Sequence, residues 1–222
     1  MTDIVGWNPS DYTALVNMAY SLGAPAEWFA AVMMSESSMQ ASAQNSSGCV
    51  GLIQFCSPPV ANMTSMTPAQ QMPYVANYYL PKVPAGGFIS RAQIYQANYL
   101  PATIAKDGSD PSAVISTKGD GLYQGVIFDH TNKGYTTVGD LEYRLAQVTQ
   151  GAKWQAVLDG IQAAGGSQPV NTPSSVASFV SSDLKQVAAI ALAGTVVGAA
   201  GWYIYINRDL FAPHPITRRR RA

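Results

Sequence analysis

Glu36 is the residue whose type and setting most directly suggest chemistry. It comes at the end of an apolar run that includes Val32, Met33 and Met34. A carboxylic acid that is partly shielded from water has a raised pKa, and it can then hold a proton near neutral pH. Such an acid can protonate the leaving oxygen of a glycosidic bond, so Glu36 is predicted to be a general acid.

The residues that follow Glu36 form a pattern with a defined spacing. Ser37 comes next, a small polar loop contains Gly48 and Gly51, and Gln54 lies 18 residues after the glutamate. This pattern resembles that of the soluble-type lytic transglycosylases. These lysozyme-like enzymes cut the sugar backbone of bacterial peptidoglycan.

The resemblance covers about residues 10–160, is specific within residues 33–55, and implies both a fold and a reaction. The fold would be a mostly α, lysozyme-like domain of the goose-type or transglycosylase kind. Members of this family work with one catalytic acid, here Glu36, and cleave the β-1,4 bond between MurNAc and GlcNAc. The 6-hydroxyl of the muramyl sugar closes a ring, so the product ends in 1,6-anhydroMurNAc and no water is consumed. No cofactor and no metal are implied.

The resemblance also assigns residues to substrate binding. Ser37 belongs to the Glu-Ser pair of the family and is expected to steady the local backbone. Gly48 and Gly51 would let the loop turn tightly beside the substrate. Gln54 would line the glycan groove and hydrogen-bond a sugar or its N-acetyl group.

Two parts of the chain depart from the family pattern. The family usually has a serine nine residues after the acid, where this chain has Asn45 followed by Ser46, although asparagine can still form hydrogen bonds. A later motif of the Ala-Tyr-Asn kind, whose tyrosine approaches the acid, is matched only loosely. Tyr95 is the first candidate for that tyrosine and Tyr99 is the second.

The two cysteines, Cys49 and Cys56, lie in the same region. They could form a disulfide with each other, or both could pack as small apolar residues. We favour packing, because free cysteine is among the residue types most often buried. No histidine or further cysteine accompanies them at the spacing of a metal site.

Residues 129–140 faintly resemble a calcium-binding loop, with Asp129 in the first place and Asp140 in the twelfth. The fifth place of such a loop should offer an oxygen ligand, but here it is Lys133, which repels a cation. A turn that enters the last helix of the body is therefore the favoured interpretation.

The composition fits one domain with appendages. The chain has 222 residues, of which 47% are hydrophobic and 12% charged, against about 25% charged in a typical soluble protein. Residues 1–164 hold seven Lys or Arg and eleven Asp or Glu, whereas residues 165–222 hold six and two. An acidic body with a basic tail argues against nucleic acid as the substrate of the body.

Apolar residues at helical spacing, together with start and stop signals, predict a mostly helical body. The expected helices run from the cluster at Asn8–Asp11 to Gly23, from Pro25 to about Glu36, from Pro68 to Leu80, from Ser90 to about Tyr99, and from about Val138 to Ala164 with a break near Gly151. Residues 40–51 and 107–140 are predicted to be loops, and no strand is expected.

The chain after the domain at residues 1–164 is predicted to leave the body. Residues 165–184 are typical of a flexible linker, residues 185–207 of a transmembrane helix, and residues 208–222 of a basic tail. The segment Val187–Ile206 is 20 residues without a charge, which matches a hydrocarbon core of about 30 Å.

Partners are predicted from these segments. The lipid membrane would hold Val187–Ile206, and Gly194 with Gly198 could bring two such helices together in a homo-oligomer. Arg218–Arg221 could contact nucleic acid or anionic lipid. The protein would then be membrane-anchored and single-pass, in a virion with an internal membrane or in the host inner membrane.

No signal peptide is expected at the N-terminus, although peptidoglycan lies outside the cytoplasm. A bacteriophage protein carried in the virion, which opens the cell wall locally during infection or lysis, would resolve this difficulty. Two alternatives stay open. One is a non-catalytic structural or penetration protein whose lysozyme-like body binds glycan, and the other is a goose-type muramidase that hydrolyses the same bond with water.

Overall fold

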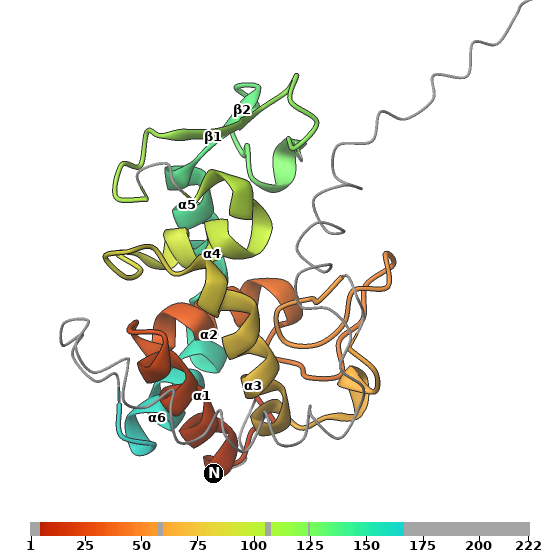
Figure 1. The fold of residues 1–222 in the computed structure, drawn as a ribbon, viewed down its shortest axis with the longest axis vertical. Helices are drawn as coiled ribbons and strands as arrows, with labels where there is room; N and C mark the ends of the chain where they lie inside the picture. Colours follow the sequence, from red (N-terminus) through yellow and green to blue (C-terminus); the bar gives the residue numbers. More distant parts are fainter. Residues whose placement is uncertain (1–4, 57–59, 105–107, 124, 167–222) are drawn as a thin grey trace, which may run out of the picture. The chain divides into compact units, whose positions relative to one another are not determined.

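The structure is a computed structural model, and it describes residues 5–56, 60–104, 108–123 and 125–166. This part of the chain contains six α-helices. They are α1 (Pro9–Ser21), α2 (Ala26–Ser37), α3 (Pro68–Tyr79), α4 (Arg91–Tyr99), α5 (Val138–Val148) and α6 (Gly151–Ala163) (Figure 1). The prediction of a mostly α fold is therefore confirmed.

The helix that carries Glu36, α2, is the one around which the others pack. Helices α1, α4, α5 and α6 all contact it, and Figure 1 shows it between α4 and α5 on one side and α1, α3 and α6 on the other. Residues along it from Phe29 to Met33 are fully buried, as expected for a helix that is apolar on nearly every side. Glu36 follows this buried part of α2 near the end of the helix, so its carboxyl group lies beside the apolar core.

Local signals fix where α1 and α2 begin and end. Asn8 caps α1 by accepting hydrogen bonds from two backbone N–H groups, and Asp11 bonds back to the N–H of Asn8, which forms a capping box. Gly23 follows α1 with a φ of +68°, a conformation in which glycine carries no steric penalty. Helix α2 stops because Ser38 is left-handed, with a φ of 54°. This stop keeps Glu36 in the last helical turn.

The other predicted helices are confirmed, with small changes at their ends. Helix α3 starts at Pro68, behind a capping box on Thr67, and ends one residue earlier than expected. The long final helix is broken, as predicted, into α5 and α6. The break occurs at Gly151, whose φ of +74° does not continue a right-handed helix.

The expectation of no strand is wrong. Strands β1 (Val114–Thr117) and β2 (Tyr135–Thr137) pair antiparallel in a two-stranded sheet. They have only four and three residues, which is too few for an alternating pattern to stand out among the turn residues around them. Strand β2 continues directly into α5, so the sheet extends the part of the body that α4 and α5 form (Figure 1).

A lysine and two buried aspartates tie this sheet to α5. Lys133 Nζ donates to Asp140 at 2.6 and 2.7 Å and lies 3.5 Å from Asp129. Asp140 also completes the capping box of α5 with Thr137. The predicted turn is therefore confined to residues 129–134, which lead into β2 and then α5, and the ammonium of Lys133 lies between the two carboxylates.

The prediction of a membrane-anchored, single-pass protein is corrected. No helix within residues 5–56, 60–104, 108–123 and 125–166 is long and apolar enough to cross a membrane. Helices α1 and α6 have 13 residues each, or about 20 Å, against a hydrocarbon core of about 30 Å. The predicted span Val187–Ile206, the linker from residue 167 and the basic tail lie outside the described residues.

Gly51 lies where the loop after α2 meets α3. It has a φ of +79°, and an added Cβ would lie 2.7 Å from Gln71 Oε1 and 2.8 Å from Met63 Cγ. Gln71 is fully buried and bonded to three backbone groups, so it is not free to move aside. Gly48 has nearly the same φ, +80°, but no atom within 4 Å of an added Cβ. A substitution at Gly48 therefore introduces backbone strain alone, whereas a substitution at Gly51 introduces backbone strain together with a lack of space.

Replacing Gly51 with alanine is expected to lower the free energy of unfolding more than replacing Gly48. Gly48→Ala should cost about 1–2 kcal/mol, which is the strain of a residue with a Cβ at positive φ. Gly51→Ala should cost a further ~1–3 kcal/mol, because the methyl group overpacks a fixed site. Urea unfolding measures both losses, and equal losses would contradict the packing of Gly51 against Gln71.

Candidate active site

Glu36 lies partly buried in the last turn of α2, which packs against α4 and α5. Burial raises the pKa of Glu36 above its ordinary value of 4.5, while a hydrogen bond from the Tyr95 hydroxyl and the positive charge of Arg144 lower it. Burial is the largest of these effects, so the pKa is raised overall. The carboxyl group therefore keeps its proton to a higher pH than an exposed glutamate does, and it can act as an acid.

Of the two candidate tyrosines, Tyr95 is the one that the structure brings to Glu36. Its hydroxyl lowers the pKa of Glu36 as a hydrogen-bond donor does, and it lies 2.9 Å from Ser35 Oγ. Burial and the negative charge of Glu36 raise the pKa of Tyr95, so its hydroxyl keeps its proton and remains a donor. The hydroxyl of Tyr99 instead donates to the carbonyl oxygen of Leu122 at 3.0 Å.

Tyr78, in the last turn of α3, and Lys82, in the short 3-10 helix Leu80–Lys82 that follows, were not among the predicted site residues. Burial and the negative charge of Glu36 raise the pKa of Tyr78 to about 12, so this tyrosine also lies within the field of the acid. Its hydroxyl donates to the carbonyl oxygen of Asn98 at 3.0 Å. The ammonium of Lys82 lies 2.9 Å from the centre of the Tyr78 ring, and burial lowers the pKa of Lys82 to about 7. Helical spacing assigns Tyr78 to the core, so the sequence does not mark it as part of a site.

Arg144 of α5 was also missed. Its Nε donates to Ser35 Oγ at 3.3 Å, and its charge acts on Glu36. Arg144 is 109 residues from Ser35 along the chain, and no local pattern pairs residues at that separation.

The loop after α2 is fastened beside Glu36 by two buried side chains. Ser37 Oγ lies 3.0 Å from the carbonyl oxygen of Met33 and 2.9 Å from that of Leu52, and it can donate to either. Gln71 of α3 accepts a hydrogen bond from the N–H of Leu52 at 2.9 Å, and its Nε2 donates to two further carbonyls at 2.7 and 2.9 Å. Ser37 is thus placed to steady the backbone, as expected. Gln71 has the same role from α3, and it was not predicted.

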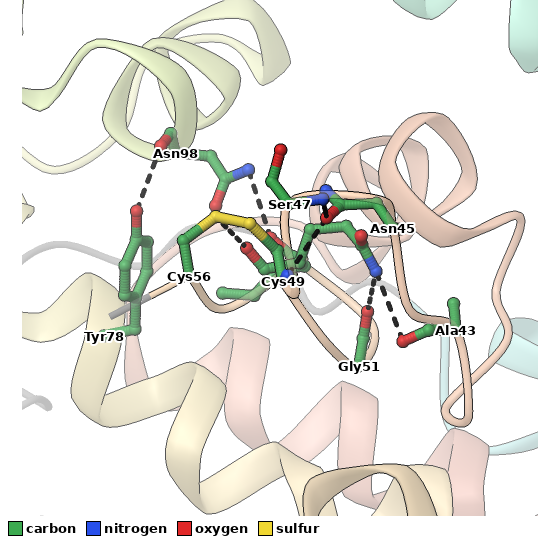
Figure 2. The surroundings of a disulfide bond; sticks show 10 residues. Ala43, Asn45, Ser47, Cys49, Gly51, Cys56, Tyr78 and Asn98 are labelled. Atoms are coloured by element: carbon green, nitrogen blue, oxygen red, sulfur yellow. Dashed lines mark hydrogen bonds between the residues drawn. A yellow bond between two sulfur atoms is a disulfide. The ribbon is translucent and has the colours of Figure 1, made fainter. Parts of the chain in front are cut away.

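Of the other predicted binding residues, Asn45 is exposed on this loop (Figure 2), Gln54 is half-buried and Gly51 is buried. Asn45 Oδ1 accepts hydrogen bonds from two backbone N–H groups of the loop, at 2.9 and 3.0 Å. Ser46 and Gly48 are exposed, and Gln54 Nε2 donates to the carbonyl oxygen of Gly51 at 3.0 Å. Asn45 and Gln54 therefore shape the loop, and their contact with a glycan stays a prediction.

Cys49 and Cys56 form a disulfide across this loop (Figure 2), so the preference for two free, packed cysteines is wrong. The reason is the backbone between them. Val50 and Phe55 exchange hydrogen bonds at 3.0 and 2.8 Å, and the residues that flank such an antiparallel pair face each other at short distance. Cys49 is buried and Cys56 is exposed. The bond closes the turn that carries Gln54.

Comparisons of the chain with models of protein families, with curated proteins and with solved structures find no match. The interpretation of this site therefore rests on the chemistry and the geometry of its own residues.

Loss of the disulfide is expected to destabilise the protein without changing its helices, because none of the helices contains Cys49 or Cys56. Reduction should lower the free energy of unfolding by about 2–3 kcal/mol, as expected for opening a short loop. Urea unfolding with and without a reducing agent measures this loss. The double variant Cys49→Ala, Cys56→Ala is the control and should not respond to the reducing agent. A wild-type protein that also fails to respond would show that the bond adds nothing to stability.

The raised pKa of Glu36 predicts that its ionisation lowers stability. The folded pKa lies above the reference value of 4.5, so the folded state favours the neutral carboxyl. This contribution is complete below the unfolded pKa, and it is lost as the pH rises through the folded pKa. Glu36→Gln keeps the neutral form at every pH. The variant should therefore gain stability relative to the wild type as the pH rises above about 4, and the gain should level off above the folded pKa.

Urea unfolding of the two proteins at a series of pH values tests this prediction. Below about pH 4 the carboxyl is protonated in both states. The difference at that pH reports only the exchange of a hydroxyl for an amide and serves as the internal control. A difference that does not change with pH would mean that Glu36 is as well solvated in the folded protein as in the unfolded chain.

Proposed function

We propose that this chain is a peptidoglycan lytic transglycosylase with Glu36 as its catalytic acid. It cleaves the β-1,4 bond between MurNAc and GlcNAc and leaves 1,6-anhydroMurNAc ends. The observation that carries the proposal is the setting of Glu36, a partly buried carboxyl whose pKa is raised and which receives a hydrogen bond from Tyr95. We also propose that the helical body around α2 is lysozyme-like.

The first half of the reaction is a proton transfer. The neutral carboxyl of Glu36 donates its proton to the glycosidic oxygen, O4 of the GlcNAc unit, as the bond from that oxygen to C1 of MurNAc breaks. Positive charge develops at C1 and negative charge develops on the carboxyl. The hydroxyl of Tyr95 and the charge of Arg144 both favour the ionised carboxyl, so they stabilise this step as it proceeds.

The site offers one carboxylate rather than two. Among the described residues, no other acidic group acts on the pKa of Glu36. Asp129 and Asp140 are engaged by Lys133, and Glu142 by an arginine. Standard glycosidases need a second carboxylate, which acts as the nucleophile or activates water. A reaction that needs only one acid fits this arrangement better.

The substrate then supplies the second group. The 6-hydroxyl of the muramyl ring attacks C1, and its proton passes to the carboxylate of Glu36. A bond from C1 to O6 replaces the bond from C1 to O4, and Glu36 regains its acid form. No water is consumed, and no second protein carboxylate is required.

The loop at residues 40–56 is the surface that we assign to glycan binding. Ser37 and Gln71 hold its backbone to α2 and α3, while Ser46 and Gly48 are exposed on its outer part. A braced loop keeps its exposed edge at a fixed position relative to Glu36. Such preorganisation lets binding energy position the scissile bond at the acid.

Glu36→Gln is expected to slow the release of soluble fragments from purified peptidoglycan by about 100-fold or more. Glutamine keeps the size of the side chain and its ability to hydrogen-bond, but it cannot give up a proton. The measurement is the rate at which the full chain releases dye from labelled peptidoglycan.

Glu27→Gln is the matched control, because it makes the same exchange at the other end of α2. This variant should keep the wild-type rate. Equal losses in both variants would indicate damage to α2, and full activity of Glu36→Gln would rule out Glu36 as the acid.

A further inference from the structure

Glu36 is the end of a chain of polar contacts that crosses three helices. The hydroxyl of Tyr95, on α4, lies beside Glu36 and favours its ionised form, as a hydrogen-bond donor does. Ser35 Oγ, on α2, lies 2.9 Å from the Tyr95 hydroxyl oxygen. The Nε of Arg144, on α5, donates to Ser35 Oγ at 3.3 Å.

The chemistry of Arg144 sets the direction of the hydrogen bonds in this chain. A guanidinium has donors only, whereas a serine or tyrosine hydroxyl has one proton and can also accept. If Ser35 accepts from Arg144 and donates to Tyr95, the proton of Tyr95 is free to be donated to Glu36. In the opposite arrangement the proton of Ser35 has no acceptor among the described residues, and Glu36 loses its donor. The arrangement that ends at Glu36 therefore gives an acceptor to both hydroxyl protons and to Nε of Arg144.

We propose that Arg144 and Ser35 are positioning residues, which orient the Tyr95 hydroxyl toward the carboxylate that Glu36 becomes when it gives up its proton. This inference rests on the proposed function. A hydrogen bond to an ionised acceptor is about twice as strong as one between neutral groups. The chain therefore contributes most once the proton has begun to leave, and such an interaction raises kcat rather than substrate affinity.

The charge of Arg144 is not taken up elsewhere. Among the described residues, Arg144 has no carboxylate within salt-bridge distance, whereas Arg91 on the neighbouring helix is paired with Glu142. The unpaired charge of Arg144 acts on Glu36 in the same direction as the hydrogen-bond chain, because it also lowers the pKa of the acid.

Ser35→Ala and Arg144→Met test this inference, with Arg91→Met as the matched control. Ser35→Ala breaks the hydrogen bonds but keeps the charge of Arg144, whereas Arg144→Met removes both. Each should lower kcat about tenfold, the effect of one hydrogen bond, and leave KM within about twofold. The alkaline limb of the pH profile of kcat should move to higher pH, because Glu36 loses groups that favour its ionised form. A merely structural role would not move that limb.

The pKa of Glu36 gives a second readout that does not depend on activity. It is measured by NMR from the carboxyl carbon in the full chain without glycan. It should rise in Ser35→Ala and in Arg144→Met, and it should keep the wild-type value in Arg91→Met. An unchanged kcat and an unchanged pKa in Ser35→Ala would overturn the inference. If the wild type cleaves no glycan but the pKa still rises in Ser35→Ala, the hydrogen-bond chain stands and the proposed function fails.

Discussion

The partial burial of one carboxyl group is the constraint on which the rest of this structure depends. Glu36 lies in the last turn of a helix whose residues from Phe29 to Met33 are fully buried, and ionising a carboxyl in such a setting costs free energy. The fold balances this cost with two groups from other helices, since Tyr95 and Arg144 both favour the ionised form. The carboxyl of Glu36 therefore keeps its proton to a higher pH than an exposed glutamate does, and α4 and α5 supply the groups that favour its ionised form.

The loop after α2 has to keep a fixed position beside Glu36. It is held there by side-chain hydrogen bonds to its backbone and by a disulfide. Ser37 and Gln71 bond the main chain of Leu52, and the disulfide from Cys49 to Cys56 closes the turn that follows. These supports are on the inner side or across the base of the turn, and the exposed outer part is the surface that we propose for glycan binding. Gly51 is needed where this loop meets Gln71, because no side chain fits there.

Local signals in the sequence were enough to predict the helices and the position of Glu36 near the end of one of them. The capping box at Asn8, the glycine after α1 and the apolar run before Glu36 all act within a few residues. The partners of the acid are not local. Arg144 meets Ser35 across 109 residues, and Gln71 is a polar residue whose burial depends on three backbone groups from other segments. The pairing of the cysteines depends on a backbone pair within a short turn, and the two strands are too short to give a pattern.

The central claim is that one carboxylic acid and the substrate's own hydroxyl complete the reaction. The most direct test is mass spectrometry of the fragments that the full chain releases from purified peptidoglycan in water enriched in oxygen-18. The account predicts fragments that end in 1,6-anhydroMurNAc and carry no oxygen-18, because no water takes part. Fragments with reducing MurNAc ends that carry oxygen-18 would contradict it, since water would then be the nucleophile and a second base would have to activate it.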